Sequence, residues 1–467
     1  MGKDSRGNSV KHNILFAYVV QIVSMLTSVV MSLIVPKMLG VEEFAFWQLF
    51  ILYASYVSFS TLGLHDGIYL INGGLSRSQI NKRSIGSQLV YMYFFQAIVG
   101  GIIILGSLLL FSGGRRLVFI LLGAYLILFN IDGSLRVLFQ AIDEVRLSSK
   151  ALLLLRASFL LLLGSLVLCN CQDYFMYIAA YVIAEAVACA YSVFHARDIL
   201  FSGLLSLKRI IPAIKNSIAA GFKLMMSMQI SMLVVGLGRF FIEWFWPQYV
   251  FGQYSFAISL VAFFNAFIIQ AAMVFFPFLR KTNEEAVRVF FVSGERALSV
   301  IMPVILICIF PLMTFIELWL PQYYESLVYL VLLLPTCIFD SKMEICCSTL
   351  FKVRREEATL LSINIASLLI AIVGSICGMM LHSLEAIIAG SVIAVVVRCF
   401  VSERHLAKCF SSREPLILSL YLVVYSVAFI IAFKLLSTWA AIAVSLALYL
   451  PLPIYLIIIK QMHKQHQ

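Results

Sequence analysis

Apolar stretches of about twenty residues recur from one end of the 467-residue sequence to the other. A helix rises 1.5 Å per residue, so about twenty residues cross a hydrocarbon core of about 30 Å. Hydrophobic residues make up 62% of the chain and charged residues 12%, against about 45–50% and about 25% in soluble domains. The sequence therefore predicts an all-α polytopic membrane protein with about 14 transmembrane helices. We expect them at 14–35, 44–64, 86–111, 117–139, 150–169, 174–194, 217–238, 250–276, 297–318, 326–350, 359–381, 384–401, 415–436 and 439–459.

The basic residues indicate how these helices are oriented, since short cytoplasmic loops of membrane proteins are enriched in Lys and Arg. With the N-terminus in the cytoplasm, 26 of the 34 Lys and Arg residues fall on the cytoplasmic side and 5 on the other, while Arg156, Lys223 and Lys342 lie within helices. We therefore expect both termini in the cytoplasm and an even number of crossings. The net charge of +11 follows from this orientation. Because the basic residues are scattered over short segments, no nucleic-acid partner is expected.

The connecting segments are too short for a soluble catalytic domain. The longest lie around 65–85, 196–216 and 277–296. The sequence contains no glycine-rich phosphate loop, nucleotide-binding motif or nucleophile constellation. It has 10 cysteines, but their spacing resembles no zinc site. The sequence thus predicts a protein that is not an enzyme and that uses no cofactor or metal.

A line of polar residues on the first predicted helix recurs 203 residues later. The first copy lies on one helix face and consists of Asn13, Ala17, Gln21, Ser24, Ser28 and Ser32. The second copy consists of Asn216, Ala220, Ser227 and Ser231, with Lys223 added. A polar helix face is unfavourable in contact with lipid, so this face is expected to contact protein or to line a cavity. The repeat predicts two six-helix lobes, 1–196 and 217–402, a cytoplasmic linker at 197–216, and two further helices with a cytoplasmic tail in 403–467.

Four segments carry a resemblance to a known family: Pro36–Trp47, Leu62–Gly67, Phe275–Phe278 and Leu318–Tyr323. With the helix count and spacing along nearly the whole chain, they make the sequence resemble polysaccharide flippases of the Wzx type, in the superfamily that also holds multidrug and lipid II exporters. The resemblance implies two lobes around a central cavity that opens alternately to either side, lined by the first, second, seventh and eighth helices.

The resemblance also implies a cargo and a location. The cargo is an undecaprenyl-diphosphate-linked oligosaccharide, an O-antigen-type unit for lipopolysaccharide. It moves from the cytoplasmic to the periplasmic leaflet of the bacterial inner membrane, with the lipid tail remaining in the bilayer. A polysaccharide polymerase and a chain-length regulator are the protein partners that the resemblance suggests.

Two basic residues within helices are candidates for binding this cargo, because a charge inside the bilayer is costly and needs a reason. Lys223 lies on the second polar line and could attract the diphosphate or contact sugar; the alternative is a side chain that reaches back to the membrane surface. Arg156 could grip phosphate oxygens in a two-pronged contact. Its alternatives are a pair with Asp132 or a side chain that also reaches the surface, while Asp132 and Arg136 are expected to pair with each other.

Two acidic residues are candidates for ion coupling. Glu185, near the middle of the sixth helix, could take up and release a proton; the alternative is a neutral, hydrogen-bonded side chain in a helix contact. Asp340 shares a helix face with Glu344, while Lys342 points nearly opposite. These three residues also fit a packing network rather than a site.

Uncharged polar residues complete the predicted cavity lining: Gln21, Ser24, Ser28, Ser227, Ser231, Asn265 and Gln270. The amides can hydrogen-bond sugar hydroxyls, or else neighbouring helices. His65 and Asp66, flanked by Gly63 and Gly67, indicate either a hinge that gates the cavity or a plain helix end, which the sequence favours.

Two other functions stay open. A cation-coupled multidrug exporter of the same fold would favour acidic residues in the first-half cavity. A membrane O-antigen polymerase would need a large outer loop to hold its acceptor, and the short outer loops count against it.

Overall fold

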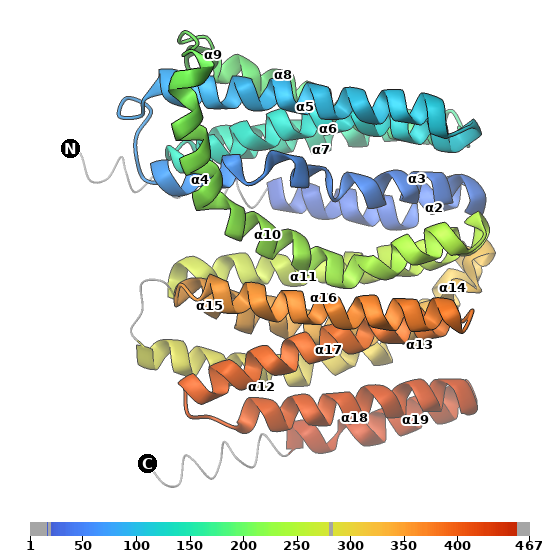
Figure 1. Cartoon of the computed structure of the whole chain (residues 1–467). Helices are drawn as coiled ribbons and strands as arrows, with labels where there is room; N and C mark the ends of the chain where they lie inside the picture. The colour runs from blue at the N-terminus through green and yellow to red at the C-terminus, as the bar shows by residue number, and fades with distance from the viewer. Residues whose placement is uncertain (1–15, 17–19, 280–283, 455–467) are drawn as a thin grey trace. The chain divides into compact units, whose positions relative to one another are not determined.

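The computed structural model describes residue 16 and residues 20–279 and 284–454, and the side chains of 266–279 lie outside the description. Within this part of the chain, helices and connecting turns form the whole structure and no β-strand occurs (Figure 1). The first helical segment is Val20–Met38, and its last turn is α2 (Val35–Met38). The following elements, in which η1 and η2 are 3₁₀ helices and η3 is a π-helix, are α3 (Val41–Ala54), η1 (Val57–Thr61), α4 (Leu64–Asn72), α5 (Lys82–Leu110), α6 (Gly113–Ala141), α7 (Val145–Leu168), α8 (Tyr174–His195), α9 (Arg197–Leu200), α10 (Leu207–Phe245), α11 (Gln248–Leu279), α12 (Glu284–Ile307), α13 (Ile309–Trp319), η2 (Pro321–Tyr323), α14 (Ser326–Lys342), η3 (Met343–Ser348), α15 (Thr349–Val353), α16 (Glu357–Met380), α17 (Leu384–Cys409), α18 (Glu414–Leu435) and α19 (Thr438–Tyr449).

The predicted all-α polytopic membrane fold is confirmed. Among the described residues, ten helices are long and apolar enough to cross a membrane, and α3, η1 and α4 together form a further span that is bent by 58°. Every apolar stretch predicted from the sequence overlaps a helix.

Many helices extend a few residues beyond the apolar stretches that predict them, and four extend by eight residues or more, among them α4, which ends at Asn72 instead of 64. α10 begins at Leu207 instead of 217, α12 begins at Glu284 instead of 297, and α17 ends at Cys409 instead of 401. The prediction of loops at these places was wrong because a hydropathy window stops at charged residues, whereas the backbone hydrogen bonds of a helix continue through them. Arg398, which lies near the end of the predicted stretch 384–401, is buried within α17.

The chain divides into two compact units, Met1–Gln229 and Ile230–Gln467. The division falls within α10. The lobes predicted at 1–196 and 217–402 stay a prediction, and the two units are described separately below.

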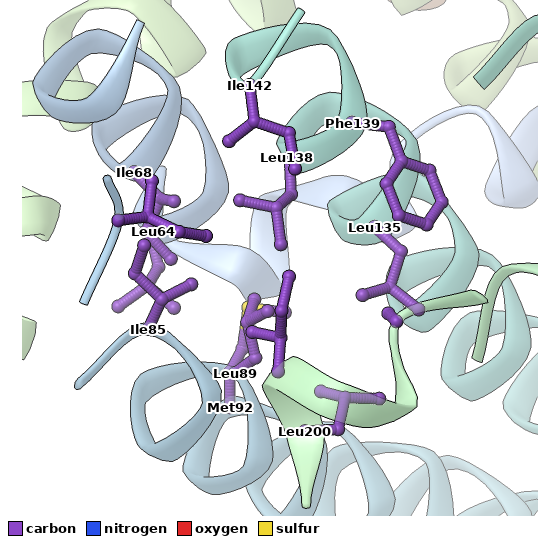
Figure 2. Packing of buried hydrophobic residues seen from close by; sticks show 13 residues of the cluster. Leu64, Ile68, Ile85, Leu89, Met92, Leu135, Leu138, Phe139, Ile142 and Leu200 are labelled. Atoms are coloured by element: carbon purple, nitrogen blue, oxygen red, sulfur yellow. The ribbon is translucent and has the colours of Figure 1, made fainter. Parts of the chain in front are cut away.

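In the first unit, a hydrophobic core joins α4, α5, α6 and α9. Figure 2 shows its side chains converging from these helices. The buried members are Leu64, Ile68, Ile80, Ile85, Leu89, Met92, Leu135, Leu138, Phe139, Ile142, Ala196, Ile199 and Leu200. Because α9 contributes to this core, the segment predicted as a linker begins as part of the first unit.

Arg77 fastens the loop between α4 and α5 to α9. Its guanidinium lies 2.8 Å from a Glu144 carboxylate oxygen and 2.7 Å from Asp198, and it also donates to the carbonyl oxygen of His195. Lys82 Nζ lies 2.8 Å from the second Asp198 oxygen. Partial burial alone would raise the pKa of Asp198, but the hydrogen bonds from Arg77 and Lys82 outweigh it and hold this pKa below its usual value.

The first half of α10 packs against α4 with no side chains between the two backbones. A Cβ atom on Gly67 would lie 1.7 Å from the carbonyl oxygen of Ser217, and one on Gly221 would lie 2.1 Å from that of Gly63. Ser217 Oγ donates a 2.7 Å hydrogen bond to Gln88 on α5. These contacts explain why the first unit includes α10 as far as Gln229.

In the second unit, α14, η3 and α15 form one continuous helix that packs against α11, α12, α17 and α18. The π-helical turn Met343–Ser348 interrupts its α-helical hydrogen bonding where the helix is buried. π-Turns inside α-helices frequently occur at functional sites. Elsewhere in the unit, α16 and α17 approach closely, because a Cβ atom on Gly374 would lie 2.6 Å from Cα of Gly390.

Candidate functional site

The second membrane span of the chain is broken at Leu62 and Gly63. Both residues have positive φ, 52° and 77°, and the helix resumes at Leu64 as α4 after the 58° bend. His65 and Asp66 lie in the first turn of α4, with Nε2 and Oδ2 3.4 Å apart. The expected plain helix end at these residues was wrong, because glycine tolerates the left-handed backbone that lets a second helix begin at once.

A cavity of about 260 Å³ lies beside this break, within the first unit. Residues of the 57–61 segment, α4, α6 and the first part of α10 line it. They are Ser58, His65, Asp66, Phe129, Asn130, Gly133, Ser134, Arg136, Val137, Gln140, Met225, Met228 and Gln229. The lining is mixed, with both acidic and basic side chains and two methionines from α10.

Two polar amides of the cavity lining, Asn130 and Gln229, are held by hydrogen bonds. Asn130 Nδ2 donates to Gln96 Oε1 at 2.8 Å and to Ser60 Oγ at 3.0 Å. Gln96 Nε2 in turn donates to the carbonyl oxygen of Ser60 at 3.0 Å. Gln229 donates to Ser58, which ties α10 to the 57–61 segment. These amides fix the wall of the cavity.

Arg136 supplies the positive charge of the cavity lining. Its Nε lies 2.6 Å from Asp132 Oδ2, and the other Asp132 oxygen accepts a 2.5 Å hydrogen bond from Ser192. The predicted Asp132–Arg136 pair is therefore confirmed. The sequence predicted only this pairing for the two residues, whereas the structure also brings Arg136 to the cavity surface.

Glu185 is fully buried on α8, and neither carboxylate oxygen has a hydrogen-bond partner among the described residues. Asp132, Arg136 and Arg156 act on it electrostatically. Arg156 Nε also has no hydrogen-bond partner in the described chain, and Asp132 is occupied by Arg136 and Ser192 rather than by Arg156. The structure thus brings together two of the predicted site residues, Glu185 on α8 and Arg156 on α7.

The first polar line is only partly described, since Asn13 and Ala17 lie outside the described residues. Gln21 is half-buried, as are Ser24 and Ser28. Both serine hydroxyls donate to carbonyl oxygens one turn earlier in their own helix, Ser24 to Val20 at 2.9 Å and Ser28 to Ser24 at 3.2 Å.

The second polar line changes character along α10. Asn216, Ala220 and Lys223 are exposed on one helix face, next to Ser217 and Gly221, which pack on α4, whereas Ser227 is buried. Ser231 accepts a 2.6 Å hydrogen bond from Arg398. Further along the chain, Asn265 is half-buried, and its Oδ1 has no partner among the described residues. The side chain of Gln270 lies outside the described residues.

The second unit contains a cluster of buried charges that sequence reasoning missed. Lys342 Nζ on α14 lies 2.9 Å from Glu295 Oε2 on α12 and 2.8 Å from Glu403 Oε1 on α17, and all three side chains are fully buried. Ser419 on α18 accepts from Lys342 and donates to Glu403 at 2.8 Å. Two carboxylates therefore share one ammonium group.

A second buried pair also joins α14 to α17. Arg398 donates to Asp340 Oδ1 at 2.5 Å, and its other terminal nitrogen binds Ser231. Both pairs adjoin η3, which begins at Met343. The expectation that Lys342 points away from Asp340 agrees with their separate partners. Glu295 and Glu403 escaped notice because each lies just outside the predicted apolar stretches.

The sequence matches no protein-family model and no curated protein. Two solved structures show what the fold is similar to. An inward-facing multidrug resistance MATE family transporter of the MOP superfamily matches with a TM-score of 0.60 and 11% identity, covering 84% of this chain and 98% of its own. The lipid II flippase MurJ, in an inward closed conformation, matches with a TM-score of 0.60 and 10% identity, covering 96% of this chain and 99% of its own. The chain therefore has the fold of MOP-superfamily transporters.

Proposed function

We propose that this protein translocates an undecaprenyl-diphosphate-linked oligosaccharide of the O-antigen type from the cytoplasmic to the periplasmic leaflet of the bacterial inner membrane, by alternating access. The observation that carries the proposal is the extent of the likeness to the lipid II flippase. It covers 96% of the chain, against 84% for the MATE transporter. These two coverages differ by about the share of the chain that follows residue 403, and this part of the chain contains the two additional helices.

The cationic side chains of the first unit support an anionic cargo. Arg136 lines the cavity and Lys223 is exposed on the polar face of α10. A diphosphate carries negative charge that a cation in a low-dielectric environment attracts strongly. Gln21, Ser24 and Ser28 supply hydrogen-bonding groups suited to sugar hydroxyls, as do Ser227, Ser231, Asn265 and Gln270.

Ion coupling is part of the proposal, with Glu185 and Asp340 as its acidic groups. Glu185 is the stronger of the two, because its buried carboxylate has no hydrogen-bond partner in the described chain, whereas Asp340 is held by Arg398. The cluster around Lys342 adds a third candidate, since two fully buried carboxylates face one ammonium group.

The partners that fit this function are the lipid-linked oligosaccharide, the bilayer, a polysaccharide polymerase and a chain-length regulator. The competing function is a cation-coupled multidrug exporter. It is favoured by the acidic Glu185 in the first unit and by the likeness to the MATE transporter. The transporter fold and the short loops speak against a membrane polymerase.

The decisive experiment measures transfer of a lipid-linked oligosaccharide in proteoliposomes, scored by the access of a lectin from one side, together with efflux of cationic drugs. We expect oligosaccharide transfer and no drug efflux. Lys223→Ala should abolish transfer, and surface polysaccharide in cells, while the protein stays in the membrane. Lys215→Ala, which removes an equally exposed cation two turns earlier on α10, is the matched control and should keep transfer. Normal transfer by Lys223→Ala would remove Lys223 from the mechanism, and drug efflux without oligosaccharide transfer would refute the proposed function.

A further inference from the structure

Three side chains with metal-ligating atoms meet at one end of the second unit. Glu356 precedes α16, and His405 and Cys409 belong to the last two turns of α17. One oxygen of Glu356, one ring nitrogen of His405 and the Cys409 sulfur all lie within 4.8 Å of one another. His405 Nε2 is already 2.7 Å from Glu356 Oε2.

The local backbone explains why these atoms converge. His405 and Cys409 are four residues apart in a helix, so their side chains project from the same face. Glu356 is brought to that face by a tight turn after α15, in which Arg355 has a φ of 58° and Glu356 N donates to the carbonyl oxygen of Phe351 at 2.9 Å.

Neighbouring side chains orient two of the three ligands. Arg354 Nε lies 2.8 Å from Glu356 Oε1, which leaves Oε2 directed at His405. The ring of Phe351 lies 5.5 Å from the imidazole, centre to centre. Groups that hold a ligand in place in this way commonly change metal affinity by about 10–100-fold when removed.

The chemistry of the three ligands selects among metals. Thiolate, imidazole and carboxylate together suit Zn²⁺, which takes three protein ligands and a water in open tetrahedral sites. Mg²⁺ and Ca²⁺ prefer oxygen ligands alone. With the thiol ionised, Cys409 and Glu356 contribute two negative charges that balance a divalent cation. Cys409 is exposed, so a metal can enter from solvent.

We propose that Glu356, His405 and Cys409 form a binding site for a zinc-class divalent cation that links the start of α16 to the end of α17. The absence of a zinc motif in the sequence does not conflict with this site. Spacing shows only the His405–Cys409 pair, and Glu356 comes from about fifty residues away along the chain. The site is independent of the transported cargo.

The test uses the purified full-length chain in lipid nanodiscs, without an affinity tag and stripped of metal. Zn²⁺ is titrated by calorimetry and by competition with a chromophoric chelator, and Co²⁺ is used as a spectroscopic probe. We expect one Zn²⁺ per chain, no competition from Mg²⁺, and a thiolate-to-cobalt charge-transfer absorption.

Matched variants assign the ligands. His405→Ala and Cys409→Ser should each weaken Zn²⁺ binding at least about tenfold, and Cys409→Ser should also abolish the charge-transfer absorption. Cys377→Ser, which removes another exposed cysteine, and His382→Ala should leave both the Zn²⁺ affinity and the charge-transfer absorption unchanged. The same holds for the paired change His463→Ala and His466→Ala, which tests the histidines near the C-terminus. Zinc binding that survives Cys409→Ser undiminished, or no binding at all by the unaltered chain, would overturn the proposal.

Discussion

Replacing Lys342 with Met should destabilise the second unit severely. Its ammonium group lies within 2.9 Å of two carboxylates, and none of the three side chains is exposed. Removing one partner of a buried ion pair costs about 3–5 kcal/mol, because the remaining charge is left uncompensated in a low-dielectric interior. Since two carboxylates stay behind here, we expect a loss at the upper end of this range.

Two matched variants separate the charge effect from the loss of a side chain. Glu403→Gln keeps an oxygen for Ser419 and Lys342 and leaves one lysine facing one carboxylate, so we expect a cost of about 1 kcal/mol. Glu414→Gln removes the charge that pairs with Arg296. The side chain of Glu414 is 22% exposed and that of Arg296 is 30% exposed. Such a partly solvated pair contributes up to about 1 kcal/mol. Combining Lys342→Met with Glu295→Gln and Glu403→Gln should recover most of the loss.

The assay is equilibrium unfolding in detergent micelles to which increasing amounts of SDS are added, followed by circular dichroism at fixed protein concentration. The quantity compared is the change in free energy of unfolding relative to the unaltered chain. The reasoning is refuted if Lys342→Met costs no more than Glu414→Gln. It is equally refuted if the neutral triple variant is as unstable as Lys342→Met alone.

Three further results are expected. Gly67→Ala should lower stability by about 1–3 kcal/mol, because the new Cβ atom would meet the Ser217 carbonyl oxygen at 1.7 Å. Gly101→Ala, with no atom within 4 Å of the added carbon, should be neutral or stabilising in the same SDS unfolding assay. Equal effects of the two changes would contradict the close helix contact. The pKa of Asp198 is held below its ordinary value of 3.8, so its stabilising effect is complete above that pH and is lost as the pH falls through the lower, folded-state pKa. Asp198→Asn should therefore lower Tm at neutral pH, and the difference from the unaltered chain should shrink towards pH 3; a difference that persists unchanged in acid would show that charge is not its cause. Glu185→Gln should remove the dependence of transport on a proton gradient while the protein still reaches the membrane, and an unchanged gradient dependence would exclude Glu185 from coupling.

The helices were predictable because hydropathy is a local property of the sequence. Every predicted apolar stretch overlaps a helix. The helix ends were less predictable, and they are where the errors matter. Glu295 and Glu403 lie two residues beyond predicted boundaries, so the buried charge cluster around Lys342 was divided between assumed helices and assumed loops.

Pairs close in sequence were also predictable. Asp132 and Arg136 are four residues apart, and their expected ion pair is confirmed at 2.6 Å. The partners of Asp340 and Lys342 were not predictable, because Arg398, Glu295 and Glu403 come from other helices. The proposed metal site was not predictable for the same reason, since Glu356 meets His405 and Cys409 only through the packing of α16 on α17.

The sequence by itself determined that this chain is a helical membrane protein, because burying backbone polar groups in lipid leaves few alternatives to long apolar helices. It also indicated which polar and charged residues need a reason to lie within those helices. Only the tertiary structure decided how those charges are compensated. It pairs Asp340 with Arg398, surrounds Lys342 with two carboxylates, and leaves Glu185 without a hydrogen bond in the described chain. The physical reason is that the energy of a buried charge depends on atoms a few ångströms away, and those atoms belong to helices that are distant in the sequence.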